Sequence, residues 1–424
     1  MNRDDLERLS KEELVELVLR LQRPAKTSRT SSKPPSTDRK EKRVASKPGG
    51  AKPGHKGHFR MLAERPDQVV AHRPARCSGC GHVFAPDAPG DVLGASDSVD
   101  LPPITPVVTR HQRLACACPG CGAWVKAEPA AAGSPFGPNI QALALYLKHL
   151  QHVSYQRLQA MFADVFGLTI SQGALGNMFG RTQAAFDAKK AAILTRLRAA
   201  PAVASDETGV RIEGVGAQHW VFRAPGIVLH EAAFSRAAQV VRDVMGGHRP
   251  AFWTSDRYSA QQNHGKRHQT CLAHLARDIA FALEVSDDPA PLRLKLWMDD
   301  VFALWRSLAD AAASTVTRKR RNLENRIGEI LCARSDCDVT RALLRKIANA
   351  RDQLLTFLDA PDLVQPTNNE CERALRPAVI SRKVTNGFRS SWAAHADAAL
   401  RTVIDTERLA GVSPYHAIRN TISA

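Results

Sequence analysis

Three acidic residues stand where a nuclease that uses two metal ions would need them. Asp206 in AVASDETGV and Asp256 in AFWTSDRYSA each close a short apolar run typical of a strand, and Glu372 in NNECERALRP lies in a run typical of a helix. Converging carboxylates can hold two divalent cations about 3.5–4 Å apart, the arrangement that cuts and joins phosphodiesters. Their hard oxygens suit Mg²⁺, which accepts phosphate oxygens as further ligands. We therefore expect two catalytic Mg²⁺ ions, with Mn²⁺ as an alternative.

Two CxxC motifs, CSGC and CPGC, precede these carboxylates, and their cysteines are Cys77, Cys80, Cys118 and Cys121. A tetrahedral Zn²⁺ takes four thiolates, and each CxxC turn supplies two of them without strain. The interval between the pairs is longer than the common spacing, which favours a zinc ribbon with an enlarged hairpin. We expect one structural Zn²⁺, with Cys116 and His82 as alternative ligands. A catalytic zinc is not expected, because four thiolates leave no open position.

The charge of the chain favours a polyanionic partner. The net charge is +17 over 424 residues, which points first to nucleic acid. Residues 20–60 hold thirteen Lys and Arg residues against Asp38 and Glu41. The functional interpretation is a basic segment that neutralises DNA phosphates, and the alternative is a solvated tail. The sequence has no apolar run of transmembrane length and no apolar signal-peptide core, so we expect a cytoplasmic, nucleoid-associated bacterial protein.

The order of elements around the two aspartates predicts their placement. Strand-like segments AVASD, GVRIEG, QHWVFRA and IVLHEAAF precede a helix over SRAAQVVRDVMGG and a strand over AFWTSD. This succession resembles the start of the ribonuclease H-like fold, in which three strands, a helix and a fourth strand follow one another. In that fold one aspartate lies on the first strand and the next at the end of the fourth. The 116 residues from Asp256 to Glu372 exceed a direct connection. We predict a catalytic domain over 201–275 and 361–424, interrupted by a helical insertion over 276–360.

The first half of the chain is predicted to form four further units. Residues 1–23 have the leucine spacing of an amphipathic helix or short coiled coil, and residues 24–65 have the composition of a basic, disordered linker. Residues 66–135 would form the zinc ribbon. Residues 136–200 predict three short helices like those of a helix-turn-helix, whose third helix could enter the major groove. A plain helical bundle would give the same pattern.

The motifs together resemble those of the insertion-sequence family sixty-six transposases, which carry a DDE catalytic domain. SSKPPSTD with KPGGAKPGHKGH resembles the family's N-terminal linker, and CSGC and CPGC resemble its zinc-binding element. SDETGV, SDRYSA and TNNECERALRPAVISRK resemble the three catalytic motifs, and the third is the most specific because it is the longest. The resemblance spans most of the chain.

The resemblance implies that Asp206, Asp256 and Glu372 are the metal ligands. Glu370 is the nearest competitor for the third role, but the two glutamates lie about 200° apart on a helix and only one can face the metals. The family's motif places its glutamate directly before an arginine, which selects Glu372. Glu207 follows Asp206 and points to the opposite face of a strand, so we interpret it as structural.

Other residues near the motifs have weaker assignments. TCLAHLARD resembles the family's cysteine–histidine segment, and for Cys271 and His274 we favour packing or positioning over metal binding. Four basic residues flank the glutamate and are candidate DNA contacts, against an alternative of ordinary surface charge: Arg373, Arg376, Arg382 and Lys383.

The function implied is a transposase that binds element ends and catalyses DNA cleavage followed by strand transfer. Its partners would be double-stranded DNA at the element ends and the target, further copies of the chain, and accessory element-encoded proteins. One alternative is an inactive DNA-binding regulator built on the ribbon and helices. Another is a ribonuclease H-fold nuclease that cuts without joining.

Overall fold

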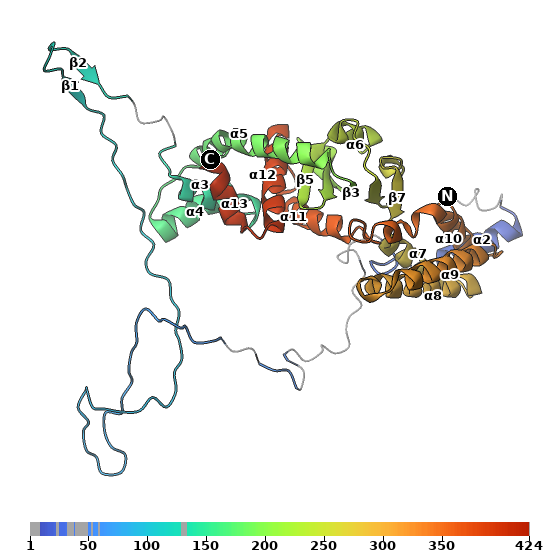
Figure 1. Cartoon of the computed structure of the whole chain (residues 1–424), viewed down its shortest axis with the longest axis horizontal. Coiled ribbons are helices and arrows are strands. Elements are labelled where there is room, and N and C mark those ends of the chain that lie inside the picture. Colours follow the sequence, from blue (N-terminus) through green and yellow to red (C-terminus); the bar gives the residue numbers. More distant parts are fainter. Residues whose placement is uncertain are drawn as a thin grey trace.

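The computed structural model describes residues 9–22, 25–31, 38, 50–51, 54–57, 60–128 and 134–423. In this part of the chain a helix-flanked sheet and an arm of long helices form the body, and an extended segment leads away from it (Figure 1). The mixed α/β class expected from the sequence is confirmed. Most of the predicted basic linker and the first eight residues of the predicted N-terminal helix lie outside the described residues.

A five-stranded mixed sheet forms the centre of the body. Its strands are β3 (Ala202–Ile212), β4 (Val215–Ala224), β5 (Ile227–Ala233), β6 (Phe252–Ser255) and β7 (Arg267–Thr270). Their spatial order is β5-β4-β3-β6-β7; β3, β4 and β5 are antiparallel neighbours, whereas β6 is parallel to both β3 and β7. The segment AVASD and most of GVRIEG, predicted as separate strands, lie within the single strand β3. The sequence analysis did not identify β7.

A tight turn fixes the register of the two longest strands. Ile212 pairs with Val215, and the two residues between them, Glu213 and Gly214, have φ values of 54° and 78°. Positive φ at both central positions is the geometry that suits the twist of a hairpin, and glycine adopts it without steric cost.

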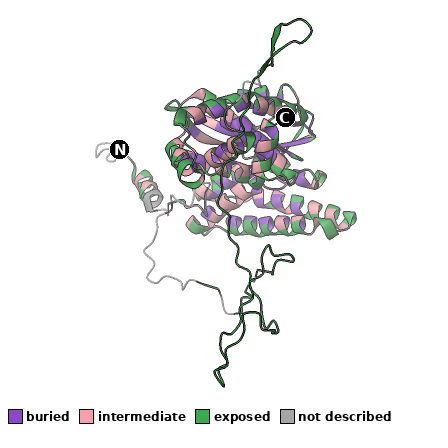
Figure 2. Ribbon diagram, turned by 90° about the vertical axis from the view of Figure 1, so that its left-hand side faces the viewer, coloured by how far each residue is buried: buried purple, intermediate pink, exposed green. Residues whose placement is uncertain are grey.

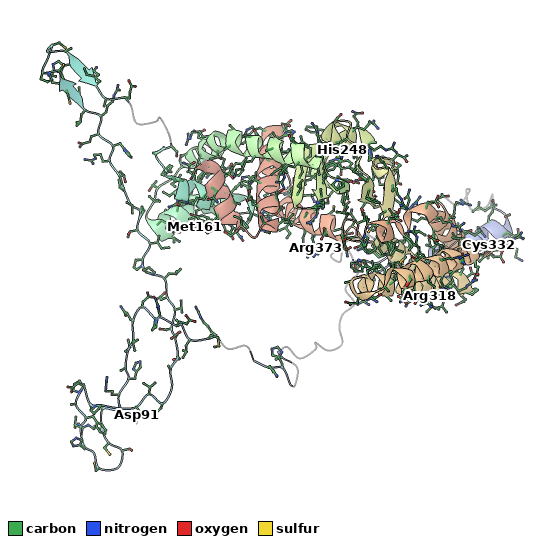
Figure 3. The ribbon with its side chains drawn as sticks, viewed as in Figure 1. Asp91, Met161, His248, Arg318, Cys332 and Arg373 are labelled. Atoms are coloured by element: carbon green, nitrogen blue, oxygen red, sulfur yellow. The ribbon has the colours of Figure 1, made fainter. Side chains whose placement is uncertain are left out.

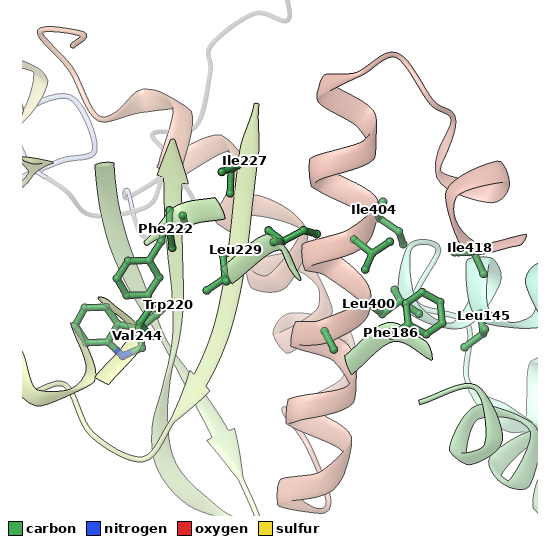
Figure 4. Close-up of a cluster of buried hydrophobic side chains, with 14 of the residues drawn as sticks. Leu145, Phe186, Trp220, Phe222, Ile227, Leu229, Val244, Leu400, Ile404 and Ile418 are labelled. Carbon is green, nitrogen blue, oxygen red and sulfur yellow. The ribbon is translucent and has the colours of Figure 1, made fainter. Parts of the chain in front are cut away.

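Helices from both ends of the sequence share one core with the sheet. These helices are α3 (Pro138–His149), α4 (Tyr155–Phe166), α5 (Gln172–Leu197), α6 (Ala238–Met245), α12 (Ser391–Leu409) and α13 (Pro414–Ile422). Ser154 and Ser171 cap α4 and α5, because each hydroxyl accepts the N–H of the residue three positions later. Trp220 and Phe222 of the sheet belong to the same buried cluster as Phe186 of α5 (Figure 4). The three helices predicted over 136–200 therefore pack with the sheet as one body.

Helix α12 covers the edge strand β5 through two threonines. The Thr402 hydroxyl accepts the backbone N–H of His230 at 2.9 Å, and the Thr406 hydroxyl accepts that of Val228 at 3.1 Å. The Thr406 hydroxyl also donates to the Val228 carbonyl at 2.8 Å. An edge strand otherwise presents unpaired backbone groups to other chains. Here side chains from a helix occupy them.

The predicted helical insertion consists of α7 (Leu272–Val285), α8 (Pro289–Arg306), α9 (Ala313–Leu331) and α10 (Asp338–Ala348). These helices have their own buried cluster, and Trp297 within it donates its indole N–H to the Leu323 carbonyl at 2.9 Å. Figure 2 shows buried residues along both the sheet and this arm. The chain then enters α11 (Asn369–Thr385), which packs against β3 and β4.

Two small elements precede the body. In the described part of the predicted N-terminal helix, α2 (Lys11–Gln22) begins with reciprocal bonds between Ser10 and Glu13, a capping box. Strands β1 (Ala115–Ala117) and β2 (Trp124–Lys126) form a short hairpin on the extended segment, away from the sheet (Figure 1). Within the described residues, no helix is long and apolar enough to cross a membrane.

Candidate active site and zinc-binding region

Asp206 lies within β3, and Asp256 directly follows the neighbouring parallel strand β6, on the same face. Ala204 pairs with Thr254 across β3 and β6, and each aspartate lies two residues further along its strand direction. Side chains two residues apart share a face. The Asp256 carboxylate also accepts the backbone N–H of Tyr258 at 2.8 Å, which turns the chain away from the sheet at that point.

Glu372 reaches this site from the first turn of α11. Asn368, directly before the helix, is buried and donates its side-chain amide to the Ser205 carbonyl at 2.8 Å. Its backbone N–H donates to the buried Cys271 sulfur at 3.1 Å. The start of α11 is therefore attached both to β3, next to Asp206, and to the start of α7.

Two residues of α7 contact the Glu372 carboxylate. His274 Nε2 lies 3.4 Å from one of its oxygens, and Arg277 lies 3.8 Å from the other. His274 and Arg277 are three residues apart on α7, so they share one face of that helix. Glu370 instead pairs with Arg223 of β4 at 3.0 Å. The two glutamates thus have different neighbours, and only Glu372 lies beside His274.

The pKa of Asp206 reflects its burial and its acidic neighbours. Burial raises this pKa well above its usual range, and the charges of Glu207, Asp256 and Glu372 raise it further. A desolvated carboxylate beside other carboxylates is unfavourable without a compensating positive charge. A divalent cation would provide that charge, and the oxygen donors suit Mg²⁺.

Glu207 lies on the opposite face of β3, as interpreted from the sequence. Its carboxylate pairs with Arg236 at 2.6 Å and accepts the Gln261 amide at 2.6 Å. Gln261 also bonds to the Ser205 hydroxyl, two residues before Glu207 on the same face. The Arg236 guanidinium lies 3.9 Å above the ring of Tyr258. This network fixes the loop after Asp256 against the strand that carries Asp206.

The three carboxylates are not gathered around a common point. Among the described residues, no three His, Cys, Asp or Glu side chains come close enough together to hold a metal ion. Asp206, Asp256 and Glu372 nevertheless lie on one side of the sheet, and their carboxylate oxygens suit Mg²⁺ as ligands. The contacts of Glu372 with His274 and Arg277 compete with metal binding, so Glu372 would exchange them for a cation.

The four candidate DNA contacts lie on α11 beyond Glu372. Arg373 and Arg376 are exposed, and Figure 3 shows Arg373 at the surface of the body. Lys383 is exposed near the end of the helix, at a spacing that places it on the same side as the two arginines. Arg382 is half-buried, and its guanidinium donates to the Gly209 carbonyl, which ties the end of α11 to β3.

Each CxxC motif forms the tight turn expected of a metal-binding knuckle. The Cys77 N–H donates to the His82 carbonyl and the Cys118 N–H to the equivalent Ala123 carbonyl, at 2.8 and 2.7 Å. Backbone N–H groups of Cys80 and Gly79 lower the pKa of Cys77. Backbone groups inside the second turn do the same for the pKa of Cys118.

The two knuckles therefore have the same backbone hydrogen bond, and in both the pKa of the first cysteine is lowered. Both second cysteines, Cys80 and Cys121, are exposed. Thiolate is the form that binds Zn²⁺, so each turn fits half of a zinc site. Cys116 lies on β1 and His82 packs edge-on against Phe84.

Sequence reasoning missed Arg277, Arg236 and Gln261. Arg277 had a detectable signal, since it follows His274 at helical spacing in the cysteine–histidine segment. Arg236 and Gln261 had none, because their link to Glu207 depends on how loops pack around the sheet.

Comparisons with known proteins identify the same family in both parts of the chain. Residues 133–396 match the model of the Transposase IS66 family, and residues 74–122 match the zinc-finger binding domain of transposase IS66. The chain is also similar to the uncharacterised protein y4jD of Sinorhizobium fredii (strain NBRC 101917 / NGR234). The two are 23% identical over 405 residues, which cover 86% of this chain and 76% of the relative.

Proposed function

The chain belongs to the IS66 transposase family, and we propose that it binds the ends of an insertion element and catalyses Mg²⁺-dependent cleavage and strand transfer. Asp206, Asp256 and Glu372 are the proposed metal ligands. The observation that carries the proposal is their arrangement. Asp206 on β3 and Asp256, directly after the adjacent parallel strand β6, lie on one face. The charges of Asp256 and Glu372 both raise the pKa of the buried Asp206.

We propose a ribonuclease H-like catalytic core over 201–275 and 361–424, with the helical insertion between its halves. The sheet order supports this proposal, because the first strand, β3, lies in the centre. On one side β4 and β5 continue the sheet by antiparallel pairing, and on the other β6 and β7 continue it by parallel pairing. The separate Glu370–Arg223 pair supports Glu372 as the third ligand.

When bound, a pair of Mg²⁺ ions would activate the attacking oxygen and stabilise the leaving oxygen of the phosphodiester. The chain's own residues position this chemistry. Asn368 and Cys271 hold the start of α11, and so the Glu372 backbone, against β3 and α7. Arg373, Arg376 and Lys383 would contact DNA phosphates along α11, and Arg382 would contribute its charge while it braces the helix.

The N-terminal half would recognise DNA. Cys77, Cys80, Cys118 and Cys121 are the proposed ligands of one structural Zn²⁺, and the helices over 136–200 are the proposed reader of element ends. The basic linker would neutralise phosphates without regard to sequence. Joining two ends calls for more than one copy of the chain, with accessory element-encoded proteins as further candidates.

Charge-removing variants of the carboxylates test the proposed chemistry. Asp206→Asn, Asp256→Asn and Glu372→Gln should each abolish Mg²⁺-dependent cleavage of an element-end duplex while DNA affinity is retained. Glu370→Gln is the matched control, since it changes the same chemical group two residues away on α11.

The assay follows both cleaved and joined strands on a labelled duplex. Cleavage without joining by the wild-type protein would favour a nuclease, and binding without cleavage would favour a regulator. An active Glu372→Gln protein together with an inactive Glu370→Gln protein would show that the third ligand is misassigned.

A further inference from the structure

A pocket of about 480 Å³ opens between the helices over 136–200 and the junction of α11 with α12. Its aromatic lining comes from separate elements: Tyr155 of α4, Phe179 of α5, Phe388 of the junction and Trp392 of α12. Its volume is typical of sites that take small organic ligands. None of these residues belongs to the proposed catalytic or zinc site.

Among these aromatic rings Trp392 has an exposed face, whereas Tyr155 packs against Phe179 and lies under the Lys148 ammonium. Tyr155 and Phe179 have ring centroids 5.8 Å apart and tilted by 33°, and the Trp392 side chain is half-exposed. Planar bases stack on such faces whatever their sequence. A half-exposed tryptophan beside a pocket is therefore available to a planar ligand.

Positive and polar groups accompany the aromatic rings. The Lys148 ammonium lies 4.4 Å from the centroid of Tyr155, and the exposed Arg389 has no ion-pair partner among the described residues. His152 adopts a left-handed φ of 56°, and its Nδ1 is buried with no hydrogen-bond partner in the described part of the protein. The pocket thus combines aromatic rings, the His152 ring nitrogen and positively charged side chains. Together these groups suit a base attached to a phosphate.

Two elements connect the pocket to the candidate active site. Helix α11 carries Glu372 at one end and the pocket residue Val384 near the other, a separation of roughly 18 Å at 1.5 Å per residue. Within strand β3, Asp206 and Ile212 are separated by roughly 20 Å, and Ile212 bridges to the pocket residue Phe388. At about 3.4 Å per nucleotide along a duplex strand, the pocket lies about five or six nucleotides from the carboxylates.

We propose that this pocket receives one unpaired nucleobase of the bound DNA, about five or six nucleotides from the phosphodiester that is cut. Trp392 stacks on the base, and the exposed Arg389 neutralises a neighbouring phosphate. The proposal rests on the proposed DNA binding. Extracting a base from the duplex costs stacking and pairing energy, so DNA that already carries an unpaired base should bind more tightly.

The test measures the affinity of the full-length protein for two fluorescein-labelled 40-base-pair duplexes by anisotropy. One duplex is fully paired, and the other carries a single extrahelical 2-aminopurine. The wild-type protein should prefer the bulged duplex by about tenfold to a hundredfold, because the cost of extracting the base is already met in that duplex. The fluorescence of 2-aminopurine should change on binding because the base moves onto an aromatic ring.

Variants locate the effect. Trp392→Ala should remove most of the preference, and Trp392→Phe should retain it because a ring face remains. Phe234→Ala, a similarly exposed aromatic outside the pocket, is the matched control. Arg389→Gln should weaken binding of the bulged duplex without altering the fold, which circular dichroism checks.

The outcomes separate this proposal from the proposed function. Equal affinity of the wild-type protein for both duplexes overturns the pocket proposal and leaves DNA binding intact, whereas binding of neither duplex overturns both. A preference that survives in Trp392→Ala and Tyr155→Ala overturns the assignment to this pocket. If the pocket instead holds part of a second copy of the chain, the wild-type protein should self-associate and Trp392→Ala should not. Self-association of this kind, with no preference for the bulged duplex, would also overturn the proposal.

Discussion

Asn368 offers a direct test of whether the attachment of α11 positions Glu372. Asn368→Ala removes the donor to the Ser205 carbonyl while the backbone bond to Cys271 can persist. A buried carbonyl that loses its donor costs about 1–3 kcal/mol. The Asn368 Oδ1 is itself buried without a partner among the described residues, so its removal offsets part of that cost. We therefore expect the free energy of unfolding to fall by about 1 kcal/mol.

The effect on cleavage should be larger than the effect on stability. A displacement of about 1 Å at a reacting group can reduce a rate by about a hundredfold. Since Asn368 fixes the first turn of α11, Asn368→Ala should lower the single-turnover cleavage rate by about that factor while the Kd for DNA stays the same. Raising the Mg²⁺ concentration should restore part of the rate, because Glu372 remains present.

The adjacent Asn369 supplies the matched control. It is exposed, so Asn369→Ala should leave stability within about 0.5 kcal/mol and cleavage close to the wild-type rate. Denaturant unfolding and quenched-flow cleavage measure the two quantities. A wild-type cleavage rate in Asn368→Ala, in protein that shows the expected loss of stability, would refute the positioning role.

Three further expectations follow from other parts of the molecule. Purified protein should contain about one Zn²⁺ per chain by metal analysis; Cys77→Ser should lower this content, and Cys332→Ser, a cysteine outside the motifs, should not. Deleting residues 24–60 should flatten the dependence of log affinity on log salt by about 0.9 for each phosphate that this segment neutralises, with the preference for element ends retained; loss of preference at an unchanged slope would contradict this division. Burial alone would raise the pKa of Asp397, but Arg401 and His149 outweigh it and hold the pKa below its usual range. The stabilisation of the folded state by the ionised Asp397 is therefore complete above the unfolded pKa of about 3.9 and declines as the pH falls below that value. In Asp397→Asn the thermal unfolding temperature should depend less on pH in this acidic range.

The sequence predicted the strands and helices with strong apolar patterns, but it did not reveal β7. This strand, RHQT, contains no apolar residue, yet Gln269 and Thr270 are fully buried. Gln269 accepts the Phe357 N–H at 2.8 Å and donates to the Leu354 carbonyl. These partners lie far along the chain, so no local pattern could indicate that the segment is a buried strand at the edge of the sheet.

The position of the first three body helices was also beyond sequence reasoning. The three helices and the cap Ser171 could be predicted, but the third helix, α5, has 26 residues and is not short as expected. Their packing depends on distant contacts such as His149 with Asp397 at 2.9 Å. Asp256 could be located because it directly follows the apolar strand β6, whereas Asp206 lies inside β3 and does not close a strand as expected. Glu207 and its partners could not be grouped, because Arg236 and Gln261 lie in different loops.

The threonine contacts between α12 and β5 have a consequence for synthesis on the ribosome. His230 and Thr402 are 172 residues apart, so β5 emerges long before the helix that covers it. At a translation rate of about 5–20 residues per second, this delay is roughly 9 to 34 seconds. During that time the nascent chain carries a bare sheet edge that a neighbouring nascent chain could pair with. Slower translation after β5 should therefore increase aggregation, and a chain truncated before α12 should require a chaperone to stay in solution.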